Sequence, residues 1–495
     1  MKQPQYKPVV KQTGKFSILI GVIFFLFLWQ FLSLVVNNQI LLPHPLTVLQ
    51  ALGKLIFEKS FRLGIISSLI SIVGGFFIGL ILGILLGHLA FFMNWSETFI
   101  NPVIYILKSS PLAAITIILM IWIKTSVLPF ALILIAIIPP IYYSTKSGLS
   151  GAATNLLEMA FVFRFKKRHT YRTIYLPALI KETLPSLDYT SGLAWKAGIT
   201  GEIMAQPFSR IGTNLYNAKI RLESSQVLAH LTVILILSLL MNYLVKTIIR
   251  FFNNKNLLPL VEDAKQHLQD NCFSKIENEQ QQSQSRHFPK VKDEQQKNIP
   301  NTVSIKNLNK SYKQQLVLNN LNCEIPKGLS TAIIGPSGQG KTTFFRILTG
   351  LEQQDSGTID FSLNPVFSYA FQDIRLLENL TLSENLLLAS GYTKNSSEAK
   401  MLLNYWEPII MELDLPLSKK IHTFSGGMKQ KSSLIRALAV NSNIIILDEV
   451  FREMDYESEK LCLKLLDKEK GNRTILLATH RQDLINSLAD FIIQI

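Results

Sequence analysis

The stretch "TAIIGPSGQGKTTFFRIL", residues 331–348, decides the fold of the second half of the chain. It fits the pattern G-x-x-x-x-G-K-[ST], with a strand-like run before it and a helix-like run after it. Glycines allow a tight turn whose amide N–H groups surround a polyphosphate, and the following helix adds the positive end of its dipole. The stretch therefore predicts a nucleotide site. A chance glycine-rich turn is the alternative.

The chemistry of phosphates assigns roles within this loop. Lys341 is placed to reach the β- and γ-phosphates, and the Thr342 hydroxyl to bind Mg²⁺. ATP and Mg²⁺ are thus the predicted cofactors. The predicted ATP-binding residues of the loop are Gly335, Pro336, Ser337, Gly338, Gln339, Gly340, Lys341, Thr342 and Thr343.

Length and composition indicate a membrane protein of more than one domain. The chain has 495 residues, of which 48% are hydrophobic and only 17% charged, and the apolar residues concentrate before residue 252. The net charge of +15 requires nucleic acid to be considered. The second half has no basic stripe with interleaved aromatic residues, so no nucleic-acid partner is predicted. The three cysteines are scattered and indicate neither a metal site nor a disulfide framework.

The first half predicts a helical, polytopic membrane domain in a lipid bilayer. A membrane helix needs about 20 apolar residues, and about six candidates are present. The third of them is short and is expected to begin earlier, near Pro102, while the fifth is broken by glycines. The candidate spans are residues 16–36, 65–89, 112–123, 128–143, 184–205 and 227–251.

Basic residues predict the topology. The opening "MKQPQYKPVVKQTGKF" carries four lysines before the first span, which indicates a cytoplasmic N-terminus. No small-residue cleavage site follows, so the first span is predicted to remain uncleaved. Six spans return the chain to the cytoplasm, where the phosphate loop meets ATP, and the basic loop between the fourth and fifth spans agrees. We therefore expect a multi-pass membrane protein whose N-terminus and nucleotide site are cytoplasmic.

The pattern along the chain predicts a transmembrane domain over residues 1–252, a linker over 253–302 and an α/β domain over 303–495. The linker is rich in Gln, Lys, Glu and Ser, and a flexible chain of about 50 residues spans roughly 40 Å. After residue 303, short apolar strands alternate with helical stretches, which is typical of a largely parallel sheet.

The run "NIIILDEV", residues 443–450, predicts a buried strand that ends in two acids. Asp448 and Glu449 would lie at the carboxyl edge of the sheet, beside the phosphate loop. Asp448 is the candidate ligand for Mg²⁺, and Glu449 the candidate to orient or deprotonate the attacking water. A solvated strand end is the alternative for such a pair standing alone.

The stretch "TFSGGMKQKSSLIRALA", residues 423–439, resembles the signature motif of ABC-transporter ATPases, with Ser425, Gly426 and Gly427 opening a helix. Other ABC motifs follow the expected order. The resemblance matches Gln372 in "AFQD" to the Q-loop, His480 in "LLATHRQ" to the switch histidine, Asp455 in "FREMDYES" to the D-loop aspartate, and Tyr312 in "NKSYKQQ" to the aromatic that stacks on adenine.

The resemblance implies a P-loop ATPase of the ABC type. It implies Glu449, His480 and Gln372 as catalytic residues, and Thr342, Gln372 and Asp448 around Mg²⁺. It also implies a homodimer, because Ser425, Gly426 and Gly427 would contact ATP bound to the second copy. Departures from the family pattern are Val450, Arg452 and Glu453 in and before the D-loop.

The stretch "EMAFVFRFKKRHTYRTIYLPA", residues 158–178, resembles the EAA loop of ABC importer permeases. Glu158, Ala160, Leu176 and Pro177 match, whereas Arg164 stands where the family has glycine. The resemblance implies a coupling loop, about residues 151–180, that docks on the ATPase near the Q-loop. A basic loop serving only topology is the alternative.

A closer likeness, through residues 191–219, is to permeases of the nitrate, sulfonate, taurine and bicarbonate group. Within it, "AWKAGITGE" places Lys196 and Glu202 at membrane depth, where ionisable residues are functional candidates. For Lys196 the hypotheses are a substrate contact, an interfacial lysine or a pair within the bundle.

Together these features predict ATP-driven import of a small solute by a fused permease and ATPase, with a separate solute-binding protein. An exporter half-transporter and a membrane-tethered ATPase without transport are the alternatives.

Overall fold

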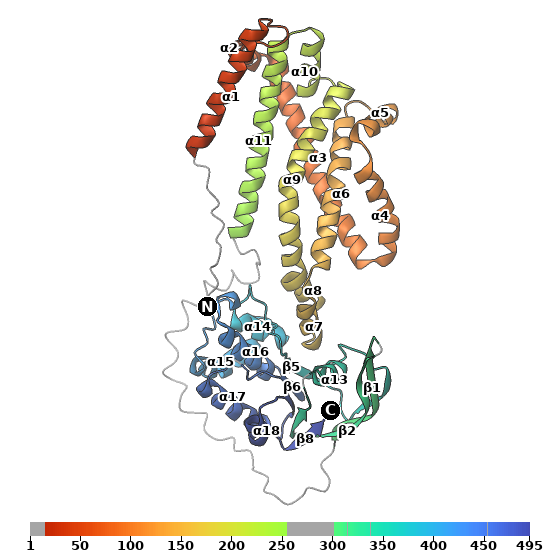
Figure 1. Cartoon of the computed structure of the whole chain (residues 1–495), viewed down its shortest axis with the longest axis vertical. Coiled ribbons are helices and arrows are strands. Elements are labelled where there is room, and N and C mark those ends of the chain that lie inside the picture. Colours follow the sequence, from red (N-terminus) through yellow and green to blue (C-terminus); the bar gives the residue numbers. More distant parts are fainter. Residues whose placement is uncertain (1–14, 255–300, 314, 337, 453) are drawn as a thin grey trace, which may run out of the picture. The chain divides into compact units, whose positions relative to one another are not determined.

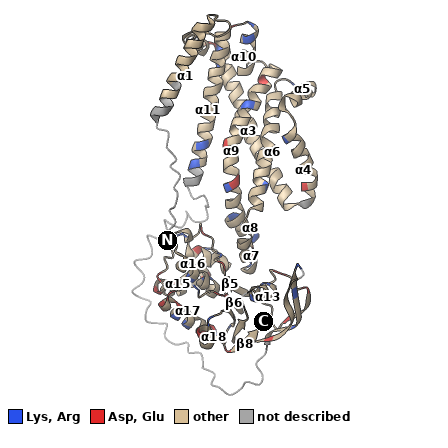
Figure 2. Ribbon diagram, viewed as in Figure 1, with Lys and Arg blue, Asp and Glu red and all other residues tan. Residues whose placement is uncertain are grey.

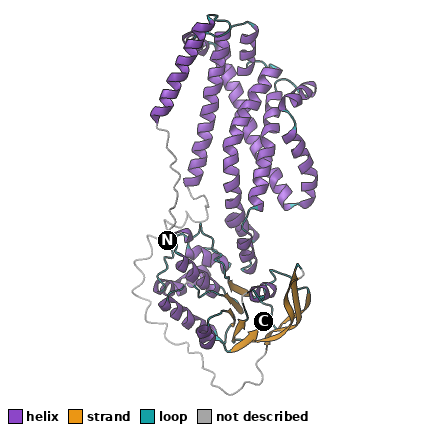
Figure 3. Cartoon of the chain, viewed as in Figure 1, coloured by secondary structure: helices purple, strands orange, loops and turns teal. Residues whose placement is uncertain are grey.

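The computed structural model describes residues 15–254 and 301–495, apart from 314, 337 and 453. The chain divides into two compact units. Within the described residues, the first unit takes 15–151 and 178–254, and the second takes 152–177 and 301–495. Most of the predicted linker, residues 255–300, lies outside the described residues. Figure 3 shows helices throughout the first unit and the strands in the second.

The first unit is built from long helices with few charged residues along them (Figures 1 and 2). Lipid offers no hydrogen-bond partners, so a segment in the membrane must satisfy its own backbone N–H and C=O groups, which favours helices. The apolar side chains on the outer faces of these helices are exposed, as expected for contact with lipid. The helices are α1 (Lys15–Val36), α2 (Pro45–Phe57), α3 (Lys59–Phe92), α4 (Asn94–Ser109), α5 (Leu112–Trp122), α6 (Leu128–Ser150), α9 (Leu176–Ala205), α10 (Ile211–Ile220) and α11 (Ser224–Asn254).

A row of glycines lets α3 and α6 approach closely. Gly75, Gly79, Gly83 and Gly87 recur every four residues of α3, so they share one face of the helix. A Cβ atom added at Gly83 would lie 2.7 Å from the Cβ of Ile141, closer than real Cβ contacts allow. Small residues at such spacing are what permits tight packing between helices in a membrane.

The described residues contain three helices that are long and apolar enough to cross a membrane, all in the first unit. They are Lys59–Phe92, Leu128–Ser150 and Ser224–Arg250, and a bent pair of helices would make four. The count of six spans therefore stays a prediction. α1 and α9 lie at the positions predicted for the first and fifth spans, and neither is among these three helices.

The predicted third span differs from the structure. Residues 94–122 form two helices, α4 and α5, rather than one helix that begins near Pro102. The two axes bend by 109° at the break between them. Ser110 and Pro111 both adopt extended backbone there, as expected of a proline and of the residue before it.

The second unit contains two sheets. A three-stranded antiparallel sheet has the order β2–β1–β4, and a five-stranded parallel sheet has the order β5–β6–β7–β3–β8. Strands β3, β6 and β7 are apolar and buried on both faces, as parallel strands covered by helices are. The strands are β1 (Asn301–Tyr312), β2 (Gln315–Pro326), β3 (Ser330–Ile334), β4 (Ser356–Phe361), β5 (Phe367–Ala370), β6 (Ile444–Asp448), β7 (Thr474–Ala478) and β8 (Phe491–Gln494).

Helices flank the parallel sheet and complete an α/β fold, as predicted (Figure 1). The core joins β6 and β7 to helices α14 to α18 through buried aliphatic side chains. The helices are α13 (Lys341–Leu348), α14 (Leu382–Ala389), α15 (Ser397–Glu412), α16 (Gly426–Ala439), α17 (Tyr456–Glu469) and α18 (Gln482–Leu488).

Residues 152–177, here named the docking segment, group with the second unit although their neighbours in sequence belong to the first. The docking segment forms α7 (Thr154–Val162), α8 (Lys167–Thr170) and a π-helical turn, η1 (Tyr171–Tyr175), which runs into α9. Leu176 and Pro177, two of the predicted coupling residues, are the first residues of α9. The π-turn precedes Pro177, which has no N–H for a regular helical hydrogen bond.

Candidate active site

The order of the parallel strands brings the predicted catalytic residues to one edge. β5, β6, β7 and β3 are consecutive neighbours, and their carboxyl ends lead into Gln372, the Asp448–Glu449 pair, His480 and the phosphate loop. Ligands of open α/β sheets bind at this edge. Residues far apart in sequence therefore meet here because of strand order.

The phosphate loop has the backbone that its glycines predict. Gly338 and Gly340 adopt φ of 83° and 96°, a region that favours glycine, and α13 begins at Lys341. A side chain at Gly340 would also meet Val317 at 2.8 Å. Lys341 is buried, and its Nζ donates to the carbonyl oxygens of Gly335, at 2.8 Å, and Pro336, at 3.1 Å. Ser337 lies outside the described residues.

Two of the three predicted Mg²⁺ ligands, Thr342 and Asp448, meet beside this loop, whereas the third, Gln372, bonds to Glu449. The Thr342 hydroxyl donates to Asp448 Oδ2 at 2.9 Å, so one hydroxyl oxygen and one carboxylate face each other. Mg²⁺ prefers oxygen ligands and is often held by one or two carboxylates together with substrate phosphates, and this donor set fits it. Burial raises the pKa of the Asp448 carboxyl, and the hydrogen bond from Thr342 opposes that rise.

Two further predicted residues, His480 and Gln372, flank the carboxylate of a third, Glu449. Glu449 Oε1 lies 3.2 Å from His480 Nε2, and Glu449 Oε2 accepts a hydrogen bond from Gln372 Nε2 at 3.4 Å. Glu449 adopts a left-handed φ of 50°, which costs a non-glycine residue of order 1–3 kcal/mol and is common at functional sites. His480 also approaches Lys341, at 3.4 Å between Nε2 and Nζ. The arrangement points a carboxylate at the edge where a nucleophilic water would lie.

Glu158 on α7 binds the docking segment to the α/β fold of the second unit. Both of its carboxylate oxygens accept hydrogen bonds at 2.8 Å from the Arg346 guanidinium on α13. Arg375 Nη1 also donates to Glu158 Oε2, at 2.7 Å. The bonds from Arg346, supported by Arg375, hold the pKa of the Glu158 carboxyl below its ordinary value. Bidentate pairs of this kind fix orientation as well as charge.

Comparison with known proteins agrees with this geometry. A family model described as "ABC transporter" matches residues 318–452, and one described as "Binding-protein-dependent transport system inner membrane component" matches residues 79–256. A phosphonates import ATP-binding protein of Fusobacterium nucleatum is 30% identical over 217 residues, which cover 39% of this chain and 87% of that relative. The chain belongs to the ABC transporter family. It joins an ABC permease domain to an ABC ATPase domain, and it is a membrane protein.

A second relative is the sulfate/thiosulfate import ATP-binding protein of Pectobacterium atrosepticum. It is 33% identical over 212 residues, which cover 39% of this chain and 63% of the relative, so the chain spans less than two thirds of that protein. A solved structure described as the ATP binding subunit of an ABC transporter is 27% identical, with a TM-score of 0.36, and the match covers 39% of this chain and 85% of that one.

The predicted signature motif opens α16. Ser425 is the N-cap residue of this helix, its hydroxyl accepts from the Met428 N–H, and Gly426 and Gly427 form the first turn. Among the described residues, no hydrogen bond or ion pair joins residues 425–427 to the phosphate loop. At its other end, α16 reaches the docking segment. The buried Arg436 guanidinium lies 4.7 Å from the Phe163 ring centroid, and Nη1 lies 2.7 Å from Met159 Sδ.

The D-loop of this ABC ATPase has a structural role besides any functional one. Asp455 is the N-cap residue of α17, where its Oδ1 accepts from the Ser458 N–H at 2.9 Å. Val450, where the family has proline, is fully buried. Arg452 is exposed, and Glu453 lies outside the described residues. Tyr312, the predicted adenine-stacking residue, is 41% exposed, and its hydroxyl donates to Glu352.

The predicted coupling loop contains a left-handed turn at Arg164, the position at which the EAA loop of importer permeases has glycine. Arg164 adopts φ of 52°, and the Phe165 N–H donates to the Ala160 carbonyl at 2.8 Å, while the Arg164 N–H donates to Phe161. This pair of bonds is the Schellman motif, which usually places glycine at the left-handed position. Arg164 Nη2 also donates to the Pro365 carbonyl at 2.7 Å. The turn is therefore present despite the departure from the family pattern.

The two ionisable residues of "AWKAGITGE" have opposite environments. Lys196 is exposed on α9, although its neighbours Trp195 and Ala197 are buried in the core of the first unit. Glu202 is fully buried, accepts hydrogen bonds from Ser68 Oγ at 2.9 Å and from the Gly212 N–H at 3.0 Å, and lies 3.8 Å from Arg210. The substrate-path role of Lys196 stays a prediction, whereas Glu202 joins α9 to α3 and α10.

The sequence motifs did not identify the two arginines that bind Glu158. Arg346 follows the phosphate loop within α13, and Arg375 follows the Q-loop. Neither position carries a signal in a single sequence, since surface arginines are common on such elements. Only the fold shows that both side chains converge on one carboxylate.

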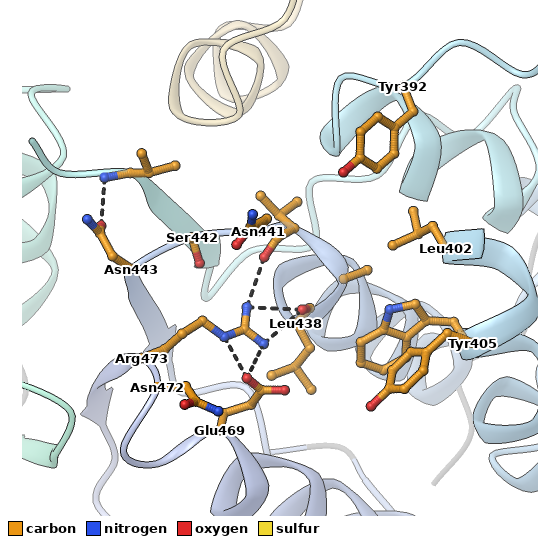
Figure 4. Close-up of a pocket in the computed structure, with 14 residues that line it drawn as sticks. Tyr392, Leu402, Tyr405, Leu438, Asn441, Ser442, Asn443, Glu469, Asn472 and Arg473 are labelled. Atoms are coloured by element: carbon orange, nitrogen blue, oxygen red, sulfur yellow. Dashed lines mark hydrogen bonds and ion pairs between the residues drawn. The ribbon is translucent and has the colours of Figure 1, made fainter. Parts of the chain in front are cut away.

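A pocket of about 630 Å³ lies away from the predicted active site (Figure 4). It is lined by residues around the start of β6 and by Tyr392 and Tyr405, whereas the phosphate loop is at the strands' other end. Arg473 in this pocket donates to Glu469 and to the carbonyls of Leu438 and Val440, as drawn in Figure 4. No predicted site residue lines it.

Proposed function

We propose that the chain is one half of an ATP-driven importer for a small solute. The observation that carries this proposal is the bidentate bond between Glu158 and Arg346, because it ties a segment between two membrane helices to the helix that begins with the phosphate-binding Lys341. A rigid link of this kind allows nucleotide-driven movement in the ATPase to reach the permease. We further propose that the ATPase faces the cytoplasm and that the bilayer is the bacterial inner membrane.

One chain supplies the residues that would hold the terminal phosphates, Mg²⁺ and the attacking water. Lys341 would release its loop carbonyls to hold the terminal phosphates, and Thr342 and Asp448 would hold Mg²⁺, which supplies charge neutralisation on those phosphates. Glu449 would take the proton of the attacking water, while His480 and Gln372 keep its carboxylate in place. Tyr312 would stack on the adenine ring.

Import is favoured over export by the form of the docking segment. It is a short pair of helices, α7 and α8, whereas exporters extend their membrane helices far from the bilayer. The two relatives are named as import ATP-binding proteins, one for sulfate/thiosulfate and one for phosphonates. We propose a small anion, such as nitrate, a sulfonate or taurine, delivered by a separate solute-binding protein. An exposed cation on α9, Lys196, supports an anionic substrate.

A membrane-tethered ATPase without transport is the other candidate function. Arg452 in the D-loop favours it, because a long charged side chain stands where small residues are usual in ABC ATPases.

Direction of transport tests the proposal. The full chain is reconstituted in liposomes that enclose labelled nitrate, sulfate or taurine together with a periplasmic extract of the source cells, and ATP with Mg²⁺ is added outside. Only molecules with the ATPase outside respond. ATP-dependent loss of label supports import. Accumulation of label supplied outside overturns the proposal of import in favour of export. ATP hydrolysis that moves neither the enclosed label nor the label supplied outside overturns the proposal in favour of the tethered ATPase.

A further inference from the structure

Tyr369 contacts the Mg²⁺-site aspartate, although no sequence motif includes it. This tyrosine is on β5 and only 1% exposed. Its hydroxyl donates to Asp448 Oδ2 at 3.1 Å, the same oxygen that accepts from Thr342 at 2.9 Å. Two hydroxyl donors from different elements thus converge on one carboxylate oxygen. Asp448 is held in a single orientation by both.

The ring of Tyr369 contacts a second aromatic side chain, which lies between Tyr369 and Arg375. It stacks on the Phe371 ring with 3.9 Å between centroids and 17° between planes. The Arg375 guanidinium carbon lies 4.0 Å from the centroid of Phe371. Arg375 in turn donates to Glu158 on the docking segment at 2.7 Å. Each contact is short, and Tyr369, Phe371 and Arg375 are all buried.

Two routes therefore join the docking segment to the Thr342–Asp448 pair. One passes from Glu158 to Arg346 within α13, the helix whose first residues include Thr342. The other passes from Glu158 through Arg375, Phe371 and Tyr369 to Asp448. The first route ends at the phosphate-loop side of the predicted site, and the second ends at Asp448.

We propose that Tyr369 is a positioning residue that links the orientation of Asp448 to the docking state of Glu158 through the Phe371–Arg375 stack. This inference rests on the proposed function, since it gives the docking segment a second route to the nucleotide site. When the docking segment shifts, Arg375 and the stacked rings shift with it. The Tyr369 hydroxyl then releases or restores the orientation in which Asp448 can bind Mg²⁺.

The alternative is a core tyrosine whose hydroxyl merely found an acceptor, as buried tyrosines usually do. Such a residue would affect unfolding but not the dependence of nucleotide binding on Mg²⁺. Contiguity alone does not demonstrate coupling, so the test has to measure coupling energy directly.

The first measurement uses Tyr369→Phe in the full-length protein, with Tyr405→Phe as a matched control because Tyr405 is exposed and remote from the metal site. Affinity for a fluorescent ATP analogue is measured with and without Mg²⁺, and Mn²⁺ binding to the nucleotide complex is followed by electron paramagnetic resonance. Tyr369→Phe should weaken the metal-dependent part of the affinity about tenfold and leave metal-free binding unchanged, as loss of a hydrogen bond to a charged group predicts. Equal metal dependence in Tyr369→Phe and wild type would overturn the proposal.

The second measurement is a double-mutant cycle between Tyr369→Phe and Arg375→Leu, because Arg375 joins the stack to Glu158. If the stack controls the orientation of Asp448, the double variant should lose no more metal affinity than the stronger single variant. Losses that multiply would mean two independent effects and would also overturn the proposal. Thermal unfolding identifies any variant that fails to fold, and Arg375→Gln then replaces Arg375→Leu. Because these readouts concern metal and nucleotide binding, a wild-type protein that binds MgATP but transports nothing would refute only the proposed function.

Discussion

The Glu158 carboxylate and the Arg346 guanidinium face each other with two hydrogen bonds of 2.8 Å, one from each terminal nitrogen. Their side chains are each 26% exposed, so the pair is only partly screened by water. The pairing joins residues 188 positions apart in sequence. It is a bidentate and charge-assisted contact between the docking segment and the rest of its unit.

Removal of this contact should uncouple ATP hydrolysis from transport. We expect Glu158→Ala to lower transport at least about tenfold while ATP hydrolysis persists at a reduced rate, since Arg346 and Arg375 lose their common acceptor but Glu449 keeps its contacts with Gln372 and His480. Transport and hydrolysis are measured in the same vesicles. Glu182→Ala, an exposed carboxylate on α9, is the control and should change neither. A Glu158→Ala protein with normal transport would leave the segment only a role in topology.

The same contact predicts a dependence on pH. The pKa of Glu158 is depressed below its ordinary 4.5, so its stabilising contribution is fully present above the unfolded value and is lost as pH falls through the depressed one. Docking should therefore not change between about pH 6 and 8 and should weaken only below about pH 4. Hydrogen exchange of α7 amides across this range checks the expectation. Weakening near neutral pH would mean that another group controls docking.

Substitutions of two charged residues of the predicted nucleotide site, Glu449 and Lys341, should impair the protein in different ways. Glu449→Gln keeps the side-chain shape and removes the base, so hydrolysis should fall about 10²–10⁴-fold while MgATP still binds. Lys341→Ala removes the buried ammonium that faces the loop and should weaken ATP binding itself. Equilibrium nucleotide binding and single-turnover hydrolysis separate the two effects. Wild-type turnover in Glu449→Gln would refute the assignment of the base.

Arg164 is in a backbone conformation that glycine adopts without strain. Arg164→Gly should keep the docking segment folded, because relief of about 1–2 kcal/mol of left-handed strain offsets the greater freedom of the unfolded glycine chain. Arg164→Val should destabilise the segment by about 1–3 kcal/mol. Arg168→Gly, on the helix α8, is the control and should cost about 1 kcal/mol. Protection of α7 amides ranks the three variants, and a stable Arg164→Val would contradict the strain argument.

The glycine row of α3 allows a sharp comparison within one helix. Gly83→Ala places a methyl group against Ile141 and the Ile138 carbonyl, which should destabilise the first unit by about 1–3 kcal/mol. Gly74→Ala on the same helix meets nothing within 4 Å and should be neutral or stabilising by up to about 1 kcal/mol. Thermal unfolding in one detergent compares the two. Equal effects would mean that helix propensity, not packing, controls this helix.

The sequence predicted the α/β fold and the residues that meet at its sheet edge, because each belongs to a motif with a fixed local geometry, such as Lys341 after Gly340. It did not predict the break at Ser110 and Pro111, where local backbone preference overrides a continuous apolar run. Nor did it identify Arg346, Arg375 or Tyr369. Those side chains gain their significance from long-range contacts with Glu158 and Asp448, and no short pattern encodes such contacts.

The ATP sites should be completed by a second copy of the chain. Ser425 caps α16, where amide groups and the helix dipole suit a phosphate, yet within the described part of the chain no bond joins it to the phosphate loop. Each chain carries one phosphate loop and one signature motif, so two chains complete two shared sites. We therefore expect a homodimer in which Ser425, Gly426 and Gly427 of each copy face the nucleotide on the other.

Mixing two inactive variants tests this arrangement. Lys341→Ala and Ser425→Arg should each trap no nucleotide alone, because both sites of each homodimer are damaged. In a mixed dimer, one site carries both lesions and the other has an intact Lys341 and an intact Ser425, so trapping should return at that one site. Differential tags confirm that mixed dimers form, and mixing Lys341→Ala with itself under two tags is the control. Tagged mixed dimers that still trap nothing would show that the sites are not shared between copies.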